Sequence, residues 1–138
     1  MGALPLATEP RDLLLGPDND LVISATGLDW VRGIDAVAQS CRIAVQMFKG
    51  EWFADLDAGI GYWDDLDGTP GILGAKPSTA ILRARSDYRD VLSARTGVLE
   101  VLVLRVSFDG ATRALSVVWQ VRTAFGDTVL DTIKMNTP

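Results

Sequence analysis

The residues best suited to chemistry lie between Phe48 and Trp63, where carboxylates are interspersed with aromatic rings. Half of the ten aromatic residues of the chain are found here: Phe48, Trp52, Phe53, Tyr62 and Trp63. Between residues 51 and 67 the chain carries six acids and no base: Glu51, Asp55, Asp57, Asp64, Asp65 and Asp67. Two such carboxylates, one kept protonated by burial and one ionised, could cleave a glycosidic bond while the rings stack on a sugar. Alternatively, the acids are solvated and the rings form a core plug or the centre of an interface.

Other catalytic and metal chemistries fit the sequence poorly. The chain has no histidine, which removes the commonest general base, the Ser-His-Asp and Cys-His arrangements, and the commonest metal ligand. A calcium loop starting at Asp55 fails because Ile60 and Leu66 stand where glycine and glutamate are required. Residues 71–78 contain two glycines, Lys76 and Ser78, as a phosphate loop does. The spacing of the glycines is wrong for such a loop, and Pro77 stands between Lys76 and Ser78. We therefore expect no metal and no cofactor.

Length and composition favour one compact domain in a reducing compartment. The 138 residues, 48% of them apolar, can bury a core without disulfides, and the single Cys41 is expected to be a small core hydrophobe. No apolar run is long enough for a bilayer, and residues 1–6 lack the features of a secretory signal, so we expect a soluble protein with no membrane partner. The net charge of −5 argues against nucleic acid as a partner, because phosphate binding needs a basic face.

Two amphipathic helices are expected to flank the aromatic segment. Residues 1–19 contain three prolines and predict an extended N-terminal arm, followed by a single domain over residues 20–138 that opens with a strand at 21–23. Asp29 is the expected N-cap of a helix over residues 30–49, ended by Gly50. A second helix is predicted over 79–95. The predicted core-facing positions are Trp30, Ile34, Val37, Cys41, Ala44, Val45 and Phe48 in the first helix, and Ile81, Ala84, Tyr88, Val91 and Leu92 in the second.

The C-terminal third changes to a period of two and predicts three antiparallel strands. They run over residues 98–108, 115–123 and 128–134, with Val101 expected on the opposite face from Leu104. The expected fold class is α+β, with two helices packed on one face of a mostly antiparallel C-terminal β-meander. The last strand contains no proline and few charges, so its free edge can either complete only its own sheet or pair with another chain.

The order of these motifs resembles a known family, the small baseplate wedge proteins of contractile phage tails, long described as tail lysozymes. The resembling stretch runs from about residue 20 to residue 133. Its most specific part is Phe48-Lys49-Gly50-Glu51-Trp52-Phe53-Ala54-Asp55, followed by Gly59-Ile60-Gly61-Tyr62. Some members carry a Glu-Pro-Arg triplet after the second helix, where this chain has Ala94-Arg95-Thr96, so only Arg95 is expected to supply part of those contacts.

The resemblance implies a non-enzymatic assembly part. It would join other baseplate wedge proteins by helix bundling, offer a sheet edge to the tail sheath protein, and act as a sheath initiator in six copies around a ring. Such a protein is made in the host cytoplasm and ends in the virion; related proteins serve type VI secretion and other contractile injection systems. The expected interaction residues are Trp52, Phe53, Tyr62, Trp63, Arg95, Val129, Leu130 and Ile133.

Two alternatives remain open at this point. One is a peptidoglycan-cleaving tail lysozyme that uses the carboxylates of the loop. The other is a sugar-binding module that stacks its ligand on Trp52, Tyr62 and Trp63.

Overall fold

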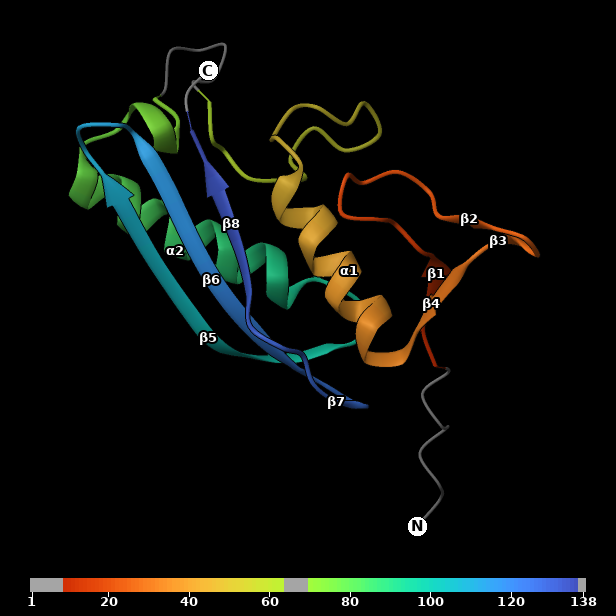
Figure 1. Ribbon diagram of the computed structural model, residues 1–138. Helices are drawn as coiled ribbons and strands as arrows, with labels where there is room; N and C mark the ends of the chain where they lie inside the picture. Colours follow the sequence, from red (N-terminus) through yellow and green to blue (C-terminus); the bar gives the residue numbers. More distant parts are fainter. Residues whose placement is uncertain (1–8, 64–69, 137–138) are drawn as a thin grey trace.

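Both helices pack on one face of a C-terminal antiparallel sheet (Figure 1). The computed structural model describes residues 9–63 and 70–136. The helices are α1 (Gly33–Gln46) and α2 (Pro77–Ser93), with a short 3₁₀ turn, η1 (Ile72–Gly74), between them. The sheet contains β5 (Val98–Asp109), β6 (Ala114–Thr123), β7 (Gly126–Asp127) and β8 (Asp131–Met135). The α+β class predicted from the sequence is confirmed.

The central strand of this sheet is β6, which pairs with β5 on one side and with β7 and then β8 on the other. All of these pairings are antiparallel. The alternation predicted for β6 is confirmed, because Leu115, Val117, Trp119, Val121 and Thr123 are all buried. Among the described residues, β5 and β8 each pair only with β6, so they form the two outer edges of the sheet.

The face assignment predicted for β5 is wrong at one position. Val101 packs against the core together with Leu104, Val106 and Phe108. The reason is a register shift between Val101 and Val103, where the ladder with β6 slips by one residue. Such a bulge moves the side chains before it to the opposite face of the strand.

The first helix starts later than predicted. Trp30–Arg32 forms strand β4, which pairs with β1 (Arg11–Leu13), and α1 begins at Gly33. Asp29 is not the N-cap, because its N–H donates to the Val22 carbonyl and its own carbonyl accepts the Leu14 N–H. Trp30 is consequently half-exposed instead of lying in the core-facing stripe.

The N-terminal arm is held against the domain in its described part. In addition to β1, the Gln39 side chain accepts the Leu15 N–H at 2.9 Å and donates to the Leu13 carbonyl at 2.8 Å. The strand predicted at residues 21–23 is displaced: β2 (Ile23–Ser24) forms a short hairpin with β3 (Gly27–Leu28). Residues 1–8 of the predicted arm lie outside the described residues.

The remaining boundaries differ by a few residues from those predicted. Helix α2 begins at Pro77, as expected of proline in a first helical turn, and ends at Ser93. The last strand begins at Asp131: Thr128 still donates its N–H to the Val121 carbonyl of β6 at 3.0 Å, but residues 129 and 130 lie outside the ladder between β7 and β8. Cys41 is fully buried, as predicted, and burial raises the pKa of its thiol to about 11, while the nearby charge of Arg95 acts in the opposite direction.

No helix within residues 9–63 and 70–136 combines the length and apolarity needed to cross a membrane.

Candidate functional site

The segment after α1 folds back on the end of the helix. The Lys49 N–H donates to the Ile60 carbonyl at 3.0 Å, and the Ile60 N–H donates to the Met47 carbonyl at 2.9 Å. Gly59 permits this return, because its φ is +100° and a Cβ there would lie 2.6 Å from the Met47 carbonyl oxygen. The first helix therefore ends at Gln46, three residues before the predicted end. We call residues 48–63 the aromatic loop.

The inner half of the aromatic loop belongs to the core. Tyr62 is fully buried and donates from its hydroxyl to the Val45 carbonyl at 2.6 Å. The Tyr88 hydroxyl on α2 hydrogen-bonds to the same Tyr62 oxygen, and burial raises the pKa of both phenols. Phe48 lies edge-on to Tyr62 and to Trp63, with ring centroids 5.8 and 6.0 Å away. This half of the loop joins α1 to α2, so Tyr62 is not available to a partner or to a sugar.

The tyrosine pair predicts unequal effects of removing either hydroxyl. The Val45 carbonyl lies in the last turn of α1, where a continued helix would pair it with the Lys49 N–H. That N–H donates to the Ile60 carbonyl instead, so the Val45 carbonyl accepts from the Tyr62 hydroxyl. Tyr62→Phe leaves this carbonyl and the Tyr88 hydroxyl without that partner and should lower the free energy of unfolding by about 2–3 kcal/mol. Tyr88→Phe, which keeps the Tyr62–Val45 bond, should cost about 1 kcal/mol. Urea denaturation checks the order; equal losses would contradict it.

The outer half of the aromatic loop projects its rings into solvent. Trp52 is 47% exposed and Phe53 is 90% exposed. Trp52 and Met47 line two hollows of about 330 and 390 Å³, and the first is also lined by Val91 and Arg95. Arg95 is exposed, and its Nε donates to the Ser40 hydroxyl at 3.0 Å. The structure thus brings Trp52 and Arg95 to one surface, which we call the Trp52 surface.

The carboxylates of the loop are solvated. Glu51, Asp55 and Asp57 are all exposed, and they make short-range bonds: Glu51 accepts the Phe48 N–H at 2.9 Å and Asp55 accepts the Asp57 N–H at 3.0 Å. These contacts are turn chemistry and keep the loop in shape. Asp64, Asp65 and Asp67 lie outside the described residues. No group of three or more potential metal ligands occurs in the part of the chain that the structure covers.

A second surface lies at the C-terminal end of the sheet. Val129 and Leu130 are exposed, at 82% and 53%, on the connection that leads into β8. Ile133 is 7% exposed and belongs to the core, so it anchors β8 and does not face a neighbour. Val129 and Leu130 therefore lie beside the outer edge of β8.

Sequence reasoning missed the residues that flank this edge. Arg42 of α1 forms an ion pair with Asp131, 89 positions away along the chain, with 2.6 Å between Arg42 Nη1 and Asp131 Oδ1. The sequence carries no local signal for a pair so distant.

Comparisons with known proteins address the function. A family model described as "contractile injection system sheath initiator" matches residues 11–126. Among solved structures, a protein of Geobacter sulfurreducens provisionally named tail lysozyme is similar, with a TM-score of 0.58 and 16% sequence identity over 86% of this chain and 97% of that one. At this identity the likeness shows the shared fold. Among curated protein sequences none matches significantly.

The family match covers most of the chain and includes both helices, the aromatic loop, β5 and β6. The chain therefore belongs to the contractile injection system sheath initiator family.

Proposed function

We propose that this protein is a non-enzymatic subunit that links the baseplate wedge of a contractile phage tail to the first ring of sheath. The observation that carries the proposal is the family match over residues 11–126 in a chain whose last strand, β8, pairs only with β6 among the described residues. A sheath ring needs a fixed template, and an outer strand supplies one because its backbone groups are arranged for pairing. Six copies around the tube would give the ring its symmetry.

The accepted element is an extended segment of the sheath protein, added to the outer edge of β8. The Thr132 N–H bonds to the Asp131 carboxylate and the Thr132 carbonyl to Arg42, so neither group is used by β6. In an antiparallel ladder the outward groups alternate along the strand, so Lys134 also presents its N–H and carbonyl outward. Backbone pairing at these residues would supply affinity, and the exposed Val129 and Leu130 would contact the side chains of the segment.

The wedge side of the link is the Trp52 surface. Exposed tryptophans beside apolar hollows are typical anchors of interfaces. Phe53 follows Trp52 in the chain and is 90% exposed, and Trp63, 37% exposed, packs its ring on Phe48 at the border of the core.

Trp52→Ala should weaken wedge binding at least about 30-fold, as expected for the loss of a buried aromatic anchor. The matched control is Trp30→Ala, because Trp30 has similar exposure, 52%, but lies on β4. Binding to the purified wedge complex is measured by calorimetry. Equal losses for the two variants would contradict the assignment of the Trp52 surface.

The initiating role is tested by omitting the protein. Particles made without this chain should carry a tube on the baseplate but no sheath, and adding the purified protein should restore sheath assembly. Sheaths of normal length in its absence, seen by electron microscopy, would contradict the proposal.

A peptidoglycan-cleaving role is the second candidate, and the described site offers little for it. Glycosidic cleavage needs one carboxyl group kept protonated by an apolar environment, whereas Glu51, Asp55 and Asp57 are exposed.

A further inference from the structure

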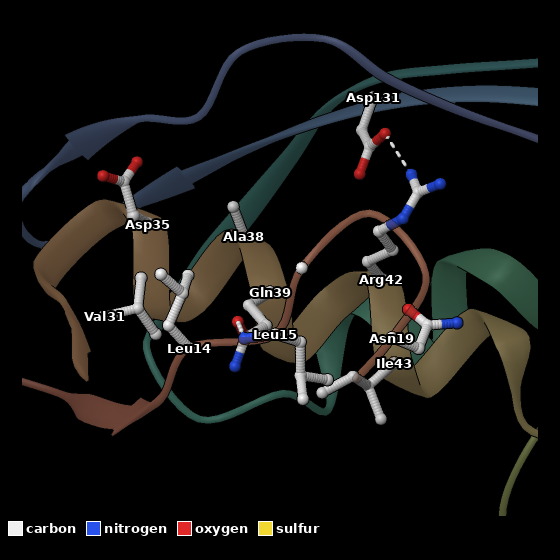
Figure 2. Close-up of a pocket in the computed structure, with 11 residues that line it drawn as sticks. Leu14, Leu15, Asn19, Val31, Asp35, Ala38, Gln39, Arg42, Ile43 and Asp131 are labelled. Carbon is white, nitrogen blue, oxygen red and sulfur yellow. Dashed lines mark hydrogen bonds and ion pairs between the residues drawn. The ribbon is translucent and has the colours of Figure 1, made fainter. Parts of the chain in front are cut away.

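The outer edge of β8 is blocked at its first outward position, Thr132, by side chains of the protein itself. Arg42 Nη1 on α1 lies 2.6 Å from Asp131 Oδ1 (Figure 2). The same carboxylate oxygen accepts the Thr132 N–H at 2.8 Å. Arg42 Nη1 also donates to the Thr132 carbonyl at 3.4 Å. The ion pair thus occupies both backbone groups with which an incoming strand would pair at Thr132.

We propose that Arg42 and Asp131 form an edge guard, which keeps a second copy of the protein from adding to β8 before the sheath arrives. The inference rests on the proposed function, in which β8 accepts a strand. An open strand edge pairs with any strand that reaches it, and proteins protect such edges by short length and by charge. β8 is five residues long and carries Lys134 at its second outward position, so blocking Thr132 leaves only a short open stretch.

The guard is placed so that a specific partner can displace it. The side chains of Arg42 and Asp131 are 40% and 30% exposed, so water competes with their attraction. Both residues line two adjoining cavities, of about 320 and 260 Å³, which leave the Arg42 side chain room to move. The larger cavity, shown in Figure 2, is also lined by Asn19, whose side-chain oxygen can accept a hydrogen bond from the guanidinium once it leaves Asp131. Pairing along several residues of β8 can therefore replace the bonds of the guard.

Amide hydrogen exchange measures the guard directly. Asp131→Ala removes the acceptor of the Thr132 N–H together with the partner of Arg42, and should speed exchange at Thr132 at least about tenfold. The matched control is Glu100→Ala, which breaks an exposed ion pair with Arg122, 3.1 Å apart, that bridges β5 and β6. It should leave exchange at Thr132 unchanged. Arg42→Gln, a second variant that keeps the Asp131 side chain, should give a smaller increase and serves if Asp131→Ala does not fold.

Sedimentation velocity over a range of concentrations then tests the protective role. The wild-type protein and Glu100→Ala should stay monomeric, whereas Asp131→Ala should self-associate; adding Lys134→Pro to it should restore the monomer, because the next outward N–H is removed. Unchanged exchange at Thr132 in both guard variants, or variants that stay monomeric, would overturn the proposal. Failure of the proposed function is a separate outcome: sheaths would then start normally on Lys134→Pro particles, whatever the exchange at Thr132.

Discussion

Gly59→Ala should destabilise the protein far more than Gly50→Ala, although both glycines have a positive φ. Gly59 has a φ of +100° and Gly50 has a φ of +87°, so any other residue is strained at either position. At Gly50 a Cβ meets nothing within 4 Å. At Gly59 it would lie 2.6 Å from the Met47 carbonyl oxygen and 2.9 Å from the Phe48 carbonyl carbon, both of them backbone atoms.

The cost of Gly59→Ala includes the contacts that would have to separate. Moving the backbone apart breaks the two hydrogen bonds by which Ile60 returns to the end of α1, and Ile60 and Tyr62 follow directly in the core. We expect Gly50→Ala to cost about 1–2 kcal/mol, the penalty of a left-handed residue. Gly59→Ala should cost about 3–5 kcal/mol, in the range of changes that break packing as well as backbone geometry. Urea denaturation of both variants measures the difference in their free energies of unfolding. Losses that agree to within about 0.5 kcal/mol would contradict the close packing described for Gly59.

Lys134→Pro should strongly reduce sheath initiation and leave the fold intact. The Lys134 N–H points away from β6, so proline at this outer position removes no bond within the sheet but deprives an added strand of a donor. We expect the fraction of tails with sheath to fall at least about tenfold. The added strand loses one backbone hydrogen bond out of few, and the proline ring also obstructs its approach to β8. The readout is electron microscopy of particles assembled with each variant.

Lys134→Ala is the control for this experiment, because it removes the side chain and keeps the N–H. It should initiate sheath like the wild-type protein. Removing residues 128–138 is a poorer test, since Ile133 and Thr128 are buried and their loss would damage the core. Normal sheaths on particles with folded Lys134→Pro would mean that β8 does not accept a strand.

The sequence predicts the parts of this fold that follow from local periodicity. The alternation of β6 and the helical spacing of Ala84, Tyr88 and Leu92 in α2 are strong patterns, and those residues are buried as expected. The start of α1 was misplaced because Trp30 fits the helical stripe, while its pairing with Leu13 in β1 depends on a segment seventeen positions earlier. Tertiary pairing decides such cases against local propensity.

The candidate site was predictable only in outline. The density of rings drew attention to the aromatic loop, but spacing alone does not separate Tyr62, which closes the core, from Trp52 and Phe53, which face solvent. Likewise, the sequence of residues 128–133, which has no proline and a single charge, does not reveal that Val129 and Leu130 lie outside the ladder while Ile133 lies inside it. The Arg42–Asp131 pair joins a helix to a strand 89 residues later, and only the folded chain brings them together.

A cryo-electron microscopy map of the junction between the baseplate and the first sheath ring tests most directly whether β8 accepts a strand. We expect an extended segment of the sheath protein paired antiparallel or parallel along Thr132 and Lys134 of β8, with the Arg42 side chain displaced from Asp131. A map in which the outer edge of β8 faces solvent, or in which sheath subunits attach to this protein only elsewhere, would contradict this role of β8.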